Sequence, residues 1–196
     1  MKLLDSFSFQ NQRFLIRVDY NVPMDSDLNI TDDTRMRVTL PTINKIISSG
    51  GSVVLMSHRG RPKGLDDSLS MRHLVSRLSD LLSQEVKFID HCIGDKVTKT
   101  SKSLKSGEVL LVENLRFHDE ETAGDIDFAK QLSELGDVYV NDAFGTAHRA
   151  HASTAIIAQF FKKNKCFGYV MANEIENIDK VVGGAKKPFT AIMGGA

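Results

Sequence analysis

Four short segments of the sequence place arginine or histidine side chains just after an apolar run. They are Arg17–Pro23, Met56–Pro62, Glu113–Phe117 and Val138–His151. The last is the most informative, because a β-branched run ends in two polar residues, a glycine follows, and Arg149 lies between His148 and His151. Cationic side chains on a loop freed by glycine can bind an anion. A solvated basic turn is the alternative for this segment taken alone.

Arginine is the most frequent cation in this set. Its planar guanidinium matches the oxygens of carboxylates and phosphates in pairs, so several arginines suit a small ligand with more than one anionic end. The candidate anion-binding arginines are Arg35, Arg59, Arg61, Arg116 and Arg149. Asp19 and Asn21 add acceptors that can hold a substrate hydroxyl or fix an arginine, and His58, His148 and His151 can carry a proton-dependent part of the charge.

Other interpretations stay open for two of these residues and for Arg17. Arg35 can be a surface residue that pairs with Asp32 or Asp33. Arg17 lies within a strand-like run, where we favour a buried ion-pair partner. Asn21 can stabilise a turn at the end of that strand.

The elements that position these residues alternate between strand-like and helix-like patterns. The expected strands are 14–18, 52–56, 86–89, 109–112, 138–140 and 189–193. The expected helices are 34–49, broken at Pro41 with a second helix from near Leu40, and 70–82, 126–135, 153–161 and 173–182. The helix 126–135 is expected to turn Ile126, Ala129, Leu132 and Leu135 inward.

This alternation predicts an α/β fold: a Rossmann-like three-layer sandwich with a parallel sheet and helices on both faces. Ligands of such open sheets bind beyond the carboxyl ends of the strands. Each of the basic clusters follows a strand at that edge. The sequence therefore predicts one shared anion pocket.

Composition argues against several other classes of protein. The 196 residues contain 25 Lys plus Arg and 25 Asp plus Glu, so the net charge gives no general attraction for nucleic acid or an acidic membrane. Aromatic residues are not interleaved with the basic ones, which also argues against a nucleic-acid partner. No apolar run reaches the ~20 residues of a membrane span, and no signal peptide is recognised. Cys92 and Cys166 lack ligand-like spacing, so we expect free thiols, no metal site and a cytoplasmic protein.

Standard nucleotide-binding motifs are absent from the sequence. No G-x-x-x-x-G-K-[ST] occurs, and no G-x-G-x-x-G follows a strand. Gly183-Gly184 is interpreted as part of a linker. The one glycine pair directly after an expected strand is Gly194-Gly195, two residues from the last position.

Taken together, these segments resemble the N-terminal half of phosphoglycerate kinase. The motifs are R-V-D-Y-N-V-P at 17–23, D-T-R at 33–35, S-H-R-G-R-P at 57–62, E-N-L-R-F at 113–117 and N-D-A-F-G-T-A-H-R-A-H at 141–151. A-N-E-I at 172–175 and the final M-G-G-A resemble the interdomain helix and the first strand of the nucleotide-binding domain. The match runs in order along essentially the whole chain.

The resemblance implies a hinge-bending, two-domain glycolytic kinase that transfers a phosphoryl group between 1,3-bisphosphoglycerate and ADP, giving 3-phosphoglycerate and ATP. It implies an acid-substrate domain at 1–172, an interdomain helix and linker at 173–187, and the start of a nucleotide domain at 188–196. By matching motif, the substrate-binding residues are Asp19, Tyr20 through its backbone, Asn21, Arg35, His58, Arg59, Gly60, Arg61, Arg116 and Arg149, with His148 and His151 as further candidates. Arg35 resembles the catalytic arginine that steadies charge on the transferred group.

The resemblance also implies Mg-ADP and Mg-ATP as the nucleotides of a full-length, monomeric enzyme. Here Gly194 and Gly195 supply only part of the nucleotide loop, and the lysine that follows in the family is missing. We therefore expect this polypeptide to be the phosphoglycerate-binding half, inactive alone and with no nucleotide bound. Tyr20 stands where phenylalanine is more usual, and Arg59 occupies a variable position. The alternative is a stand-alone anion-binding module without catalysis.

Overall fold

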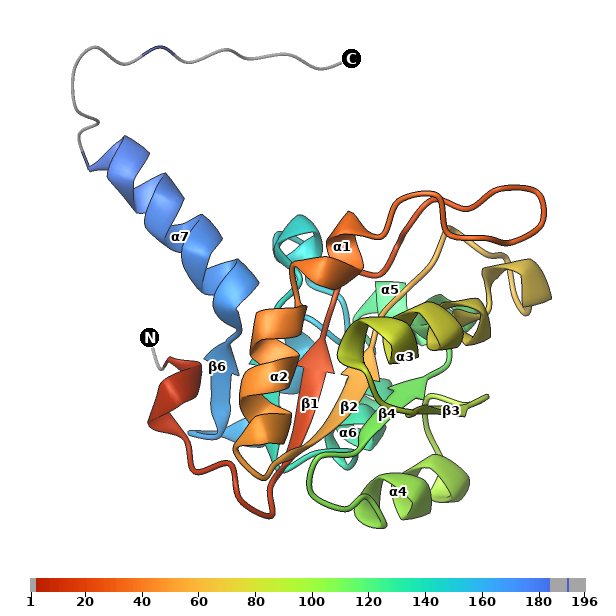
Figure 1. Cartoon of the computed structure of the whole chain (residues 1–196), viewed down its shortest axis with the longest axis horizontal. Helices are drawn as coiled ribbons and strands as arrows, with labels where there is room; N and C mark the ends of the chain where they lie inside the picture. The colour runs from red at the N-terminus through yellow and green to blue at the C-terminus, as the bar shows by residue number, and fades with distance from the viewer. Residues whose placement is uncertain (1–2, 184–189, 191–196) are drawn as a thin grey trace.

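The computed structural model describes residues 3–183 and residue 190. Within them, six parallel strands form one sheet in the order β3-β4-β2-β1-β5-β6. The strands are β1 (Arg13–Arg17), β2 (Ser52–Met56), β3 (Val86–Ile89), β4 (Val109–Val112), β5 (Val138–Asn141) and β6 (Lys165–Phe167). The order reverses between β1 and β5, and the carboxyl ends of all six strands lie at one edge (Figure 1).

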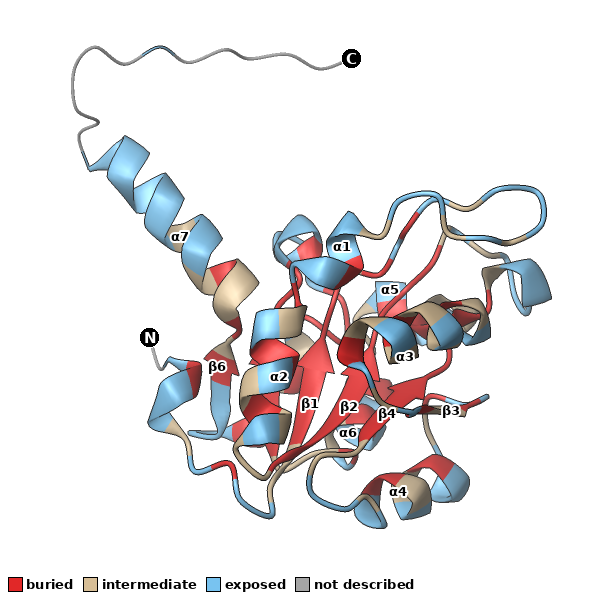
Figure 2. Ribbon diagram, viewed as in Figure 1, coloured by how far each residue is buried: buried red, intermediate tan, exposed pale blue. Residues whose placement is uncertain are grey.

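Helices and shorter 3-10 turns connect the strands. The helices are α1 (Thr34–Arg37), α2 (Leu40–Ser48), α3 (Val75–Leu82), α4 (Asp95–Lys102), α5 (Asp119–Ala123), α6 (Ile126–Ser133) and α7 (Tyr169–Val182). The 3-10 turns are Leu4–Ser6, Asp67–Leu69, Met71–Leu74, Leu115–Phe117, Phe144–Thr146 and Ile156–Phe161. Helix α7 extends away from the body of the domain, and most of its surface is exposed (Figures 1 and 2).

Two hydrophobic clusters cover the two faces of the sheet. One packs α2 and α3 against residues such as Phe14, Ile16 and Leu55. The other packs α4, α6 and the turn Ile156–Phe161 against residues such as Leu15 and Val54. Alternate residues of each central strand point to opposite faces, and both faces are buried (Figure 2). The expected three-layer sandwich with helices on both faces is therefore confirmed.

Most of the expected elements are present. Strands β2, β3 and β4 have the expected bounds, and β1 and β5 differ by one residue. The expected helix 34–49 is divided as Pro41 predicted, and the expected helix 153–161 is a 3-10 turn at Ile156–Phe161. The segment 70–82 begins as a 3-10 turn before α3. The last helix, α7, begins at Tyr169 rather than near residue 173. The expected strand 189–193 and the glycine pair Gly194-Gly195 lie outside the described residues.

One expected core residue is wrong, and two helices and one strand were missed. Ile126 is 54% exposed, because it is the first residue of α6 and the chain turns there, whereas Ala129, Leu132 and Leu135 are buried as expected. Helices α4 and α5 and strand β6 were not expected. No helix in residues 3–183 combines the length and the apolar character needed to span a bilayer.

Candidate anion-binding site

The loops after β1, β2, β4 and β5 meet in one pocket at the carboxyl edge of the sheet. Its volume is about 290 Å³. The lining residues are Asp19, Asn21, Arg35, His58, Gly60, Arg61, Arg116, Gly145, Thr146 and Arg149. Four arginines and a histidine from segments far apart in the sequence therefore share one cavity, as the positions of the strand ends require.

Two buried residues after β4 hold the neighbouring loops in place. The Glu113 carboxylate accepts hydrogen bonds from the amides of Met71 and Asn114, at 2.8 and 2.7 Å. The Asn114 side chain accepts from the Arg59 amide at 3.1 Å and donates to the carbonyl oxygens of Arg59 and Leu69, at 2.9 and 3.0 Å. The loop that carries the pocket's His58 and Arg61 is thus bonded to the end of β4 through backbone contacts.

Gly60 forms part of the pocket rim and is bonded on both sides. Its amide donates to the Asn21 side chain at 2.9 Å, and its carbonyl oxygen accepts from Arg116 Nη1 at 2.7 Å. Its φ of 61° is the left-handed conformation that favours glycine, and a Cβ here would lie 2.9 Å from Leu69 Cδ2. The amide oxygen of Asn21 therefore shapes the pocket rather than only a local turn.

Arg35 is held by the first loop. Its Nη1 donates to Asp19 Oδ2 at 2.6 Å, so its ion-pair partner is Asp19 and not Asp32 or Asp33. Asp33 instead pairs with Arg37 and Arg77. This contact turns Arg35 from the first turn of α1 toward the pocket, where half of its side chain stays exposed.

The other pocket arginines lack carboxylate partners within the described residues. Arg61 has no hydrogen bond or ion pair there, and Arg149 Nε lies 3.3 Å from His148 Nε2. The Nε of Arg116 is buried without a partner. Burial, and then the charges of Arg149, Arg17 and Arg61, lower the pKa of Arg116. Because these cations repel one another at short range, an anion that lies among them is stabilised.

His58 faces the pocket from the end of β2. It is 4% exposed, and its Nδ1 lies 3.0 Å from Nη2 of Arg17. Burial, followed by the charges of Arg17 and Arg116, lowers the pKa of His58 to about 2. This lowered pKa favours the neutral ring of His58 and argues against the expected proton-dependent charge.

Arg17 is buried as expected, but its contacts differ from the expected ion pair. Among the described residues, its guanidinium donates to Ser153 Oγ at 2.8 Å and to the carbonyl oxygen of Val18. Glu121 is linked to Arg17 through the Ser153 hydroxyl, and no direct ion pair between the two residues is seen among the described residues.

Four of the sequence candidates do not place their side chains in the pocket lining. The Tyr20 hydroxyl contacts Thr39 in the core at 2.9 Å, and Tyr20 is not among the lining residues, so substrate contact through its backbone stays a prediction. Arg59 is 5% exposed and donates to the Ser70 carbonyl at 3.0 Å. His148 is exposed, and His151 is buried, where burial lowers its pKa.

Sequence reasoning missed two lining residues and an adjoining cavity. Gly145 and Thr146 both belong to the quoted segment 141–151, and a Cβ on Gly145 would lie 3.0 Å from Asp19 Oδ2. The second cavity has a volume of about 260 Å³ and shares Arg61, Arg116 and Arg149 with the first. It is further lined by Pro62, His118, Asp119 and Thr122.

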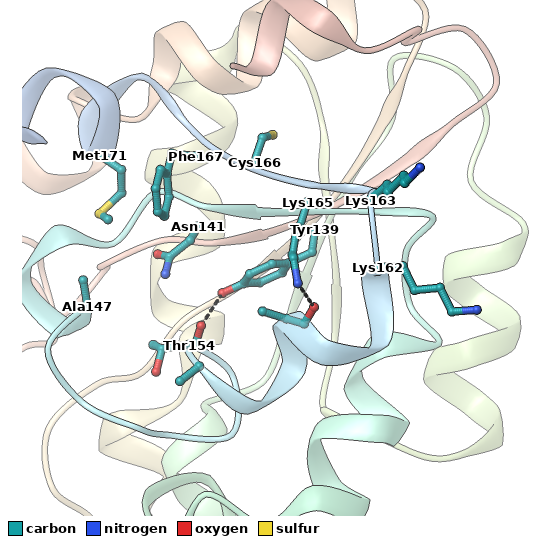
Figure 3. A pocket seen from close by; sticks show the side chains of 12 residues that line it. Tyr139, Asn141, Ala147, Thr154, Lys162, Lys163, Lys165, Cys166, Phe167 and Met171 are labelled. Atoms are coloured by element: carbon teal, nitrogen blue, oxygen red, sulfur yellow. Dashed lines mark hydrogen bonds between the residues drawn. The ribbon is translucent and has the colours of Figure 1, made fainter. Parts of the chain in front are cut away.

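A larger, mostly apolar cavity of about 580 Å³ lies beside β5, β6 and the start of α7 (Figure 3). Its wall includes Tyr139, Phe167 and Met171. Its lining includes Lys162, Lys163 and Lys165 but none of the arginines, whose planar guanidinium groups can pair with two oxygens of an anion, so its size does not make it the better candidate for an anion site. Nor do residues 3–183 and 190 contain a group of three or more His, Cys, Asp or Glu that could hold a metal ion. The basic pocket's cationic lining is equally unsuited to one.

The fold and the pocket define an α/β domain with an arginine-lined cavity at the carboxyl edge of a parallel sheet. The family model for phosphoglycerate kinase matches residues 4–196. The chain belongs to the phosphoglycerate kinase family.

Similar proteins span about twice the length of this chain. The phosphoglycerate kinase of Porphyromonas gingivalis is 44% identical over 98% of the chain and 52% of that protein. The one from Anaeromyxobacter sp. strain K is 49% identical over 100% of the chain and 50% of that protein. The solved structure from Pyrococcus horikoshii has a TM-score of 0.87 at 37% identity, covering 96% of this chain and 47% of that one. The structure from Coxiella burnetii has a TM-score of 0.84 at 34% identity, with coverages of 95% and 46%.

Proposed function

We propose that this chain is the phosphoglycerate-binding half of a phosphoglycerate kinase, which transfers a phosphoryl group between 1,3-bisphosphoglycerate and ADP. The observation that carries the proposal is the convergence of Arg35, Arg61, Arg116 and Arg149 on one cavity. Family membership and the names of the similar proteins support the same activity.

The geometry suggests a division of roles within the pocket. Arg61, Arg116 and Arg149 line both basic cavities, so we assign them to the phosphate of phosphoglycerate. Arg35 enters from the opposite loop and is held by Asp19, so we assign it to the acid end, where it neutralises charge on the transferred group. Asn21 and His58 supply polar groups between these ends, and Tyr20 contributes only its backbone.

In the forward reaction, the bond between the transferred phosphorus and the acyl oxygen of 1,3-bisphosphoglycerate breaks. A bond from that phosphorus to a terminal oxygen of ADP forms, which leaves the carboxylate of 3-phosphoglycerate. Catalysis of such a transfer depends on in-line positioning and on neutralising charge from both sides. The residues of this pocket supply the phosphoglycerate side.

The rest of the full-length enzyme also belongs to the proposal. Mg-ADP and Mg-ATP are its nucleotides, none is expected on this chain, and the enzyme is a cytoplasmic monomer. The proposed boundaries are 1–172, 173–187 and 188–196, although α7 (Tyr169–Val182) runs across the first of them.

The second candidate is an anion-binding module without catalysis. It needs a test of its own, because the chain covers only about half of each relative. Titration calorimetry with 3-phosphoglycerate, glycerol 3-phosphate and inorganic phosphate distinguishes the two at fixed salt. A phosphoglycerate site prefers 3-phosphoglycerate, because Arg35 binds the carboxylate that glycerol 3-phosphate lacks. Equal affinity for all three anions would favour the general module, and no binding of any of them would refute both.

A further inference from the structure

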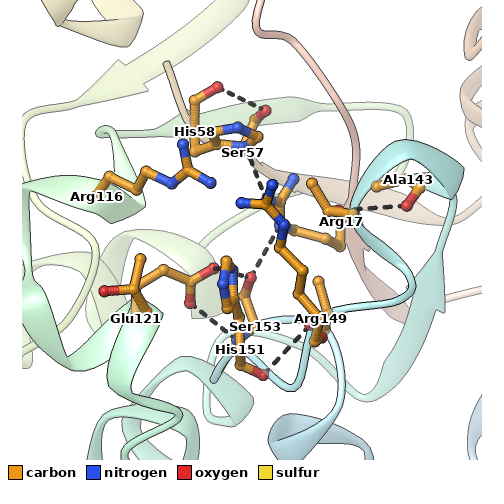
Figure 4. A network of polar contacts seen from close by, with 12 residues as sticks. Arg17, Ser57, His58, Arg116, Glu121, Ala143, Arg149, His151 and Ser153 are labelled. Atoms are coloured by element: carbon orange, nitrogen blue, oxygen red, sulfur yellow. Dashed lines mark hydrogen bonds and ion pairs between the residues drawn. The ribbon is translucent and has the colours of Figure 1, made fainter. Parts of the chain in front are cut away.

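A chain of buried polar groups leads from the basic pocket to a carboxylate beneath it (Figure 4). Its members are Glu121 of α5, Ser153 in the segment before the turn Ile156–Phe161, Arg17 of β1 and His58 after β2. Glu121, Ser153 and Arg17 have no exposed surface, and His58 is 4% exposed. Only the last of these, His58, lines the pocket.

Each hydrogen bond at the deep end of this chain has one possible direction. The Glu121 carboxylate accepts from the Ser153 amide at 2.9 Å and from the Ser153 hydroxyl at 2.6 Å. Because the hydroxyl has a single hydrogen, its oxygen is left to accept, and Arg17 Nε donates to it at 2.8 Å. Ser153 thus lies between a buried cation and a buried anion.

The direction continues to His58. A guanidinium can only donate, so Arg17 Nη2 donates to His58 Nδ1 over 3.0 Å, and Nδ1 carries no proton. The neutral ring must then carry its proton on Nε2. Within residues 3–183 and 190, no partner contacts Nε2, and Nε2 is not among the buried polar atoms left without one. The Nε2–H group is therefore open to the pocket that His58 lines.

We propose that Glu121, Ser153 and Arg17 are positioning residues that hold His58 as the neutral Nε2–H tautomer, ready to donate a hydrogen bond to an oxygen of the bound phosphoglycerate. This inference rests on the proposed function for the identity of that ligand. The tautomer itself follows from the contacts alone.

Burial and the nearby charges together keep the His58 ring neutral. Burial is the larger cause, and the charges are those of Arg17 of β1, Arg116 after β4 and Arg149 in the loop after β5, where His151 also faces the ring. A second charge in this group would be repelled, whereas a neutral donor adds a directed contact without repulsion. Glu121 supplies the counter-charge that keeps Arg17 in place, and its Oε1 lies 3.9 Å from His151 Nδ1.

Nitrogen-detected NMR of the histidine rings tests the tautomer in the wild-type chain at pH 7. We expect the shifts of His58 to show a protonated Nε2 and an unprotonated Nδ1. An Nδ1–H tautomer or an imidazolium would overturn the inference, and this arm requires no variant to fold.

The variant arm compares Ser153→Ala with Ser101→Ala. Ser101 is also fully buried, accepts from an arginine (Arg13 Nη1, 3.0 Å) and donates to a carbonyl oxygen, but it lies at the other edge of the sheet. Ser153→Ala should mix the two tautomers of His58 and raise the Kd for 3-phosphoglycerate about five- to tenfold. Ser101→Ala should change neither value.

The two arms separate this inference from the proposed function. Unchanged His58 shifts and an unchanged Kd in Ser153→Ala would overturn the positioning role. A wild-type chain with the Nε2–H tautomer but no affinity for 3-phosphoglycerate would support the tautomer and overturn the proposed function.

Discussion

Arg116 donates from Nη1 to the carbonyl oxygen of Gly60 over 2.7 Å, which joins the loop after β4 to the loop after β2 at the pocket rim. The Gly60 backbone is left-handed, and its position is fixed on the other side by Asn21. One backbone unit therefore sets where Arg116 lies relative to the other arginines. A change at Gly60 should alter ligand binding without removing any charge.

Gly60→Ala should weaken binding of 3-phosphoglycerate about tenfold. The new Cβ would lie 2.9 Å from Leu69 Cδ2, and the left-handed φ costs on the order of 1 kcal/mol for alanine. Gly64→Ala is the matched control, because Gly64 also has a positive φ but a Cβ there meets nothing within 4 Å. Calorimetry on both variants checks this, and equal Kd values for them would argue against a role of Gly60 in shaping the site.

Removal of single pocket charges should have a larger effect. Arg61→Ala and Arg149→Ala should each raise the Kd for 3-phosphoglycerate about ten- to a hundredfold, because a charge-assisted hydrogen bond contributes roughly 1.5–3 kcal/mol. Arg72→Ala removes the same charge from an exposed arginine over the Phe88 ring, away from the pocket. If Arg149→Ala and Arg72→Ala bind equally well, the ligand does not occupy this cavity.

The arginine pocket could be predicted from the sequence because the carboxyl ends of parallel strands must share an edge. Individual side-chain directions could not. Arg59 and Arg61 are two residues apart, yet the turn at Gly60 and the contacts of Asn114 bury Arg59 and leave Arg61 in the pocket. The neutral state of His58 likewise depends on Arg17, a residue 41 positions away.

The fold, too, could be predicted only in part from the sequence. The apolar run of β2 predicted its bounds correctly, because a strand that is buried on both faces is made mostly of apolar residues. Helix α4 buries only Val97 and Ser101, so its apolar pattern is too weak to recognise. Strand β6 is three residues long and begins with an exposed lysine. Its pairing with β5 is a tertiary contact that no local pattern indicates.

Asp142 should make the stability of the domain depend on pH in an unusual direction. Its Oδ1 accepts from the amides of Val170 and Met171 at the start of α7, while its Oδ2 is buried without a partner. Burial raises the pKa of Asp142 to about 6, above its unfolded value. The protonated form therefore favours the folded state, and that contribution is lost as the pH rises from about 4 through 6.

Asp142→Asn isolates this contribution, because the amide keeps the acceptor and cannot ionise. Relative to the variant, the wild type should lose roughly 2 kcal/mol of unfolding free energy between pH 4 and pH 7, which follows from a pKa difference of about two units. Urea titrations at several pH values measure it. Asp90→Asn is the control of opposite sign, because contacts with Lys96 and His91 lower the pKa of Asp90. A difference between wild type and Asp142→Asn that does not change with pH would contradict the raised pKa.

The polypeptide of these 196 residues should show no ADP-dependent turnover by itself. Its basic pocket neutralises charge on one substrate only, and the positioning of two substrates contributes ~7–11 kcal/mol of barrier reduction. Activity should appear when the remaining part of a phosphoglycerate kinase is supplied covalently or as a complementing fragment. A coupled assay on the purified chain decides this. Turnover that copurifies with the chain and is lost in Arg35→Ala would contradict the half-enzyme proposal.

A crystal structure of the chain with 3-phosphoglycerate tests the central claim most directly. The account predicts the ligand in the pocket at the carboxyl edge of the sheet, with its phosphate among Arg61, Arg116 and Arg149 and its carboxylate toward Arg35. It also predicts an oxygen of the ligand within hydrogen-bond distance of His58 Nε2. A ligand bound in the apolar cavity beside β6, or in the pocket without contact to these arginines, would contradict it.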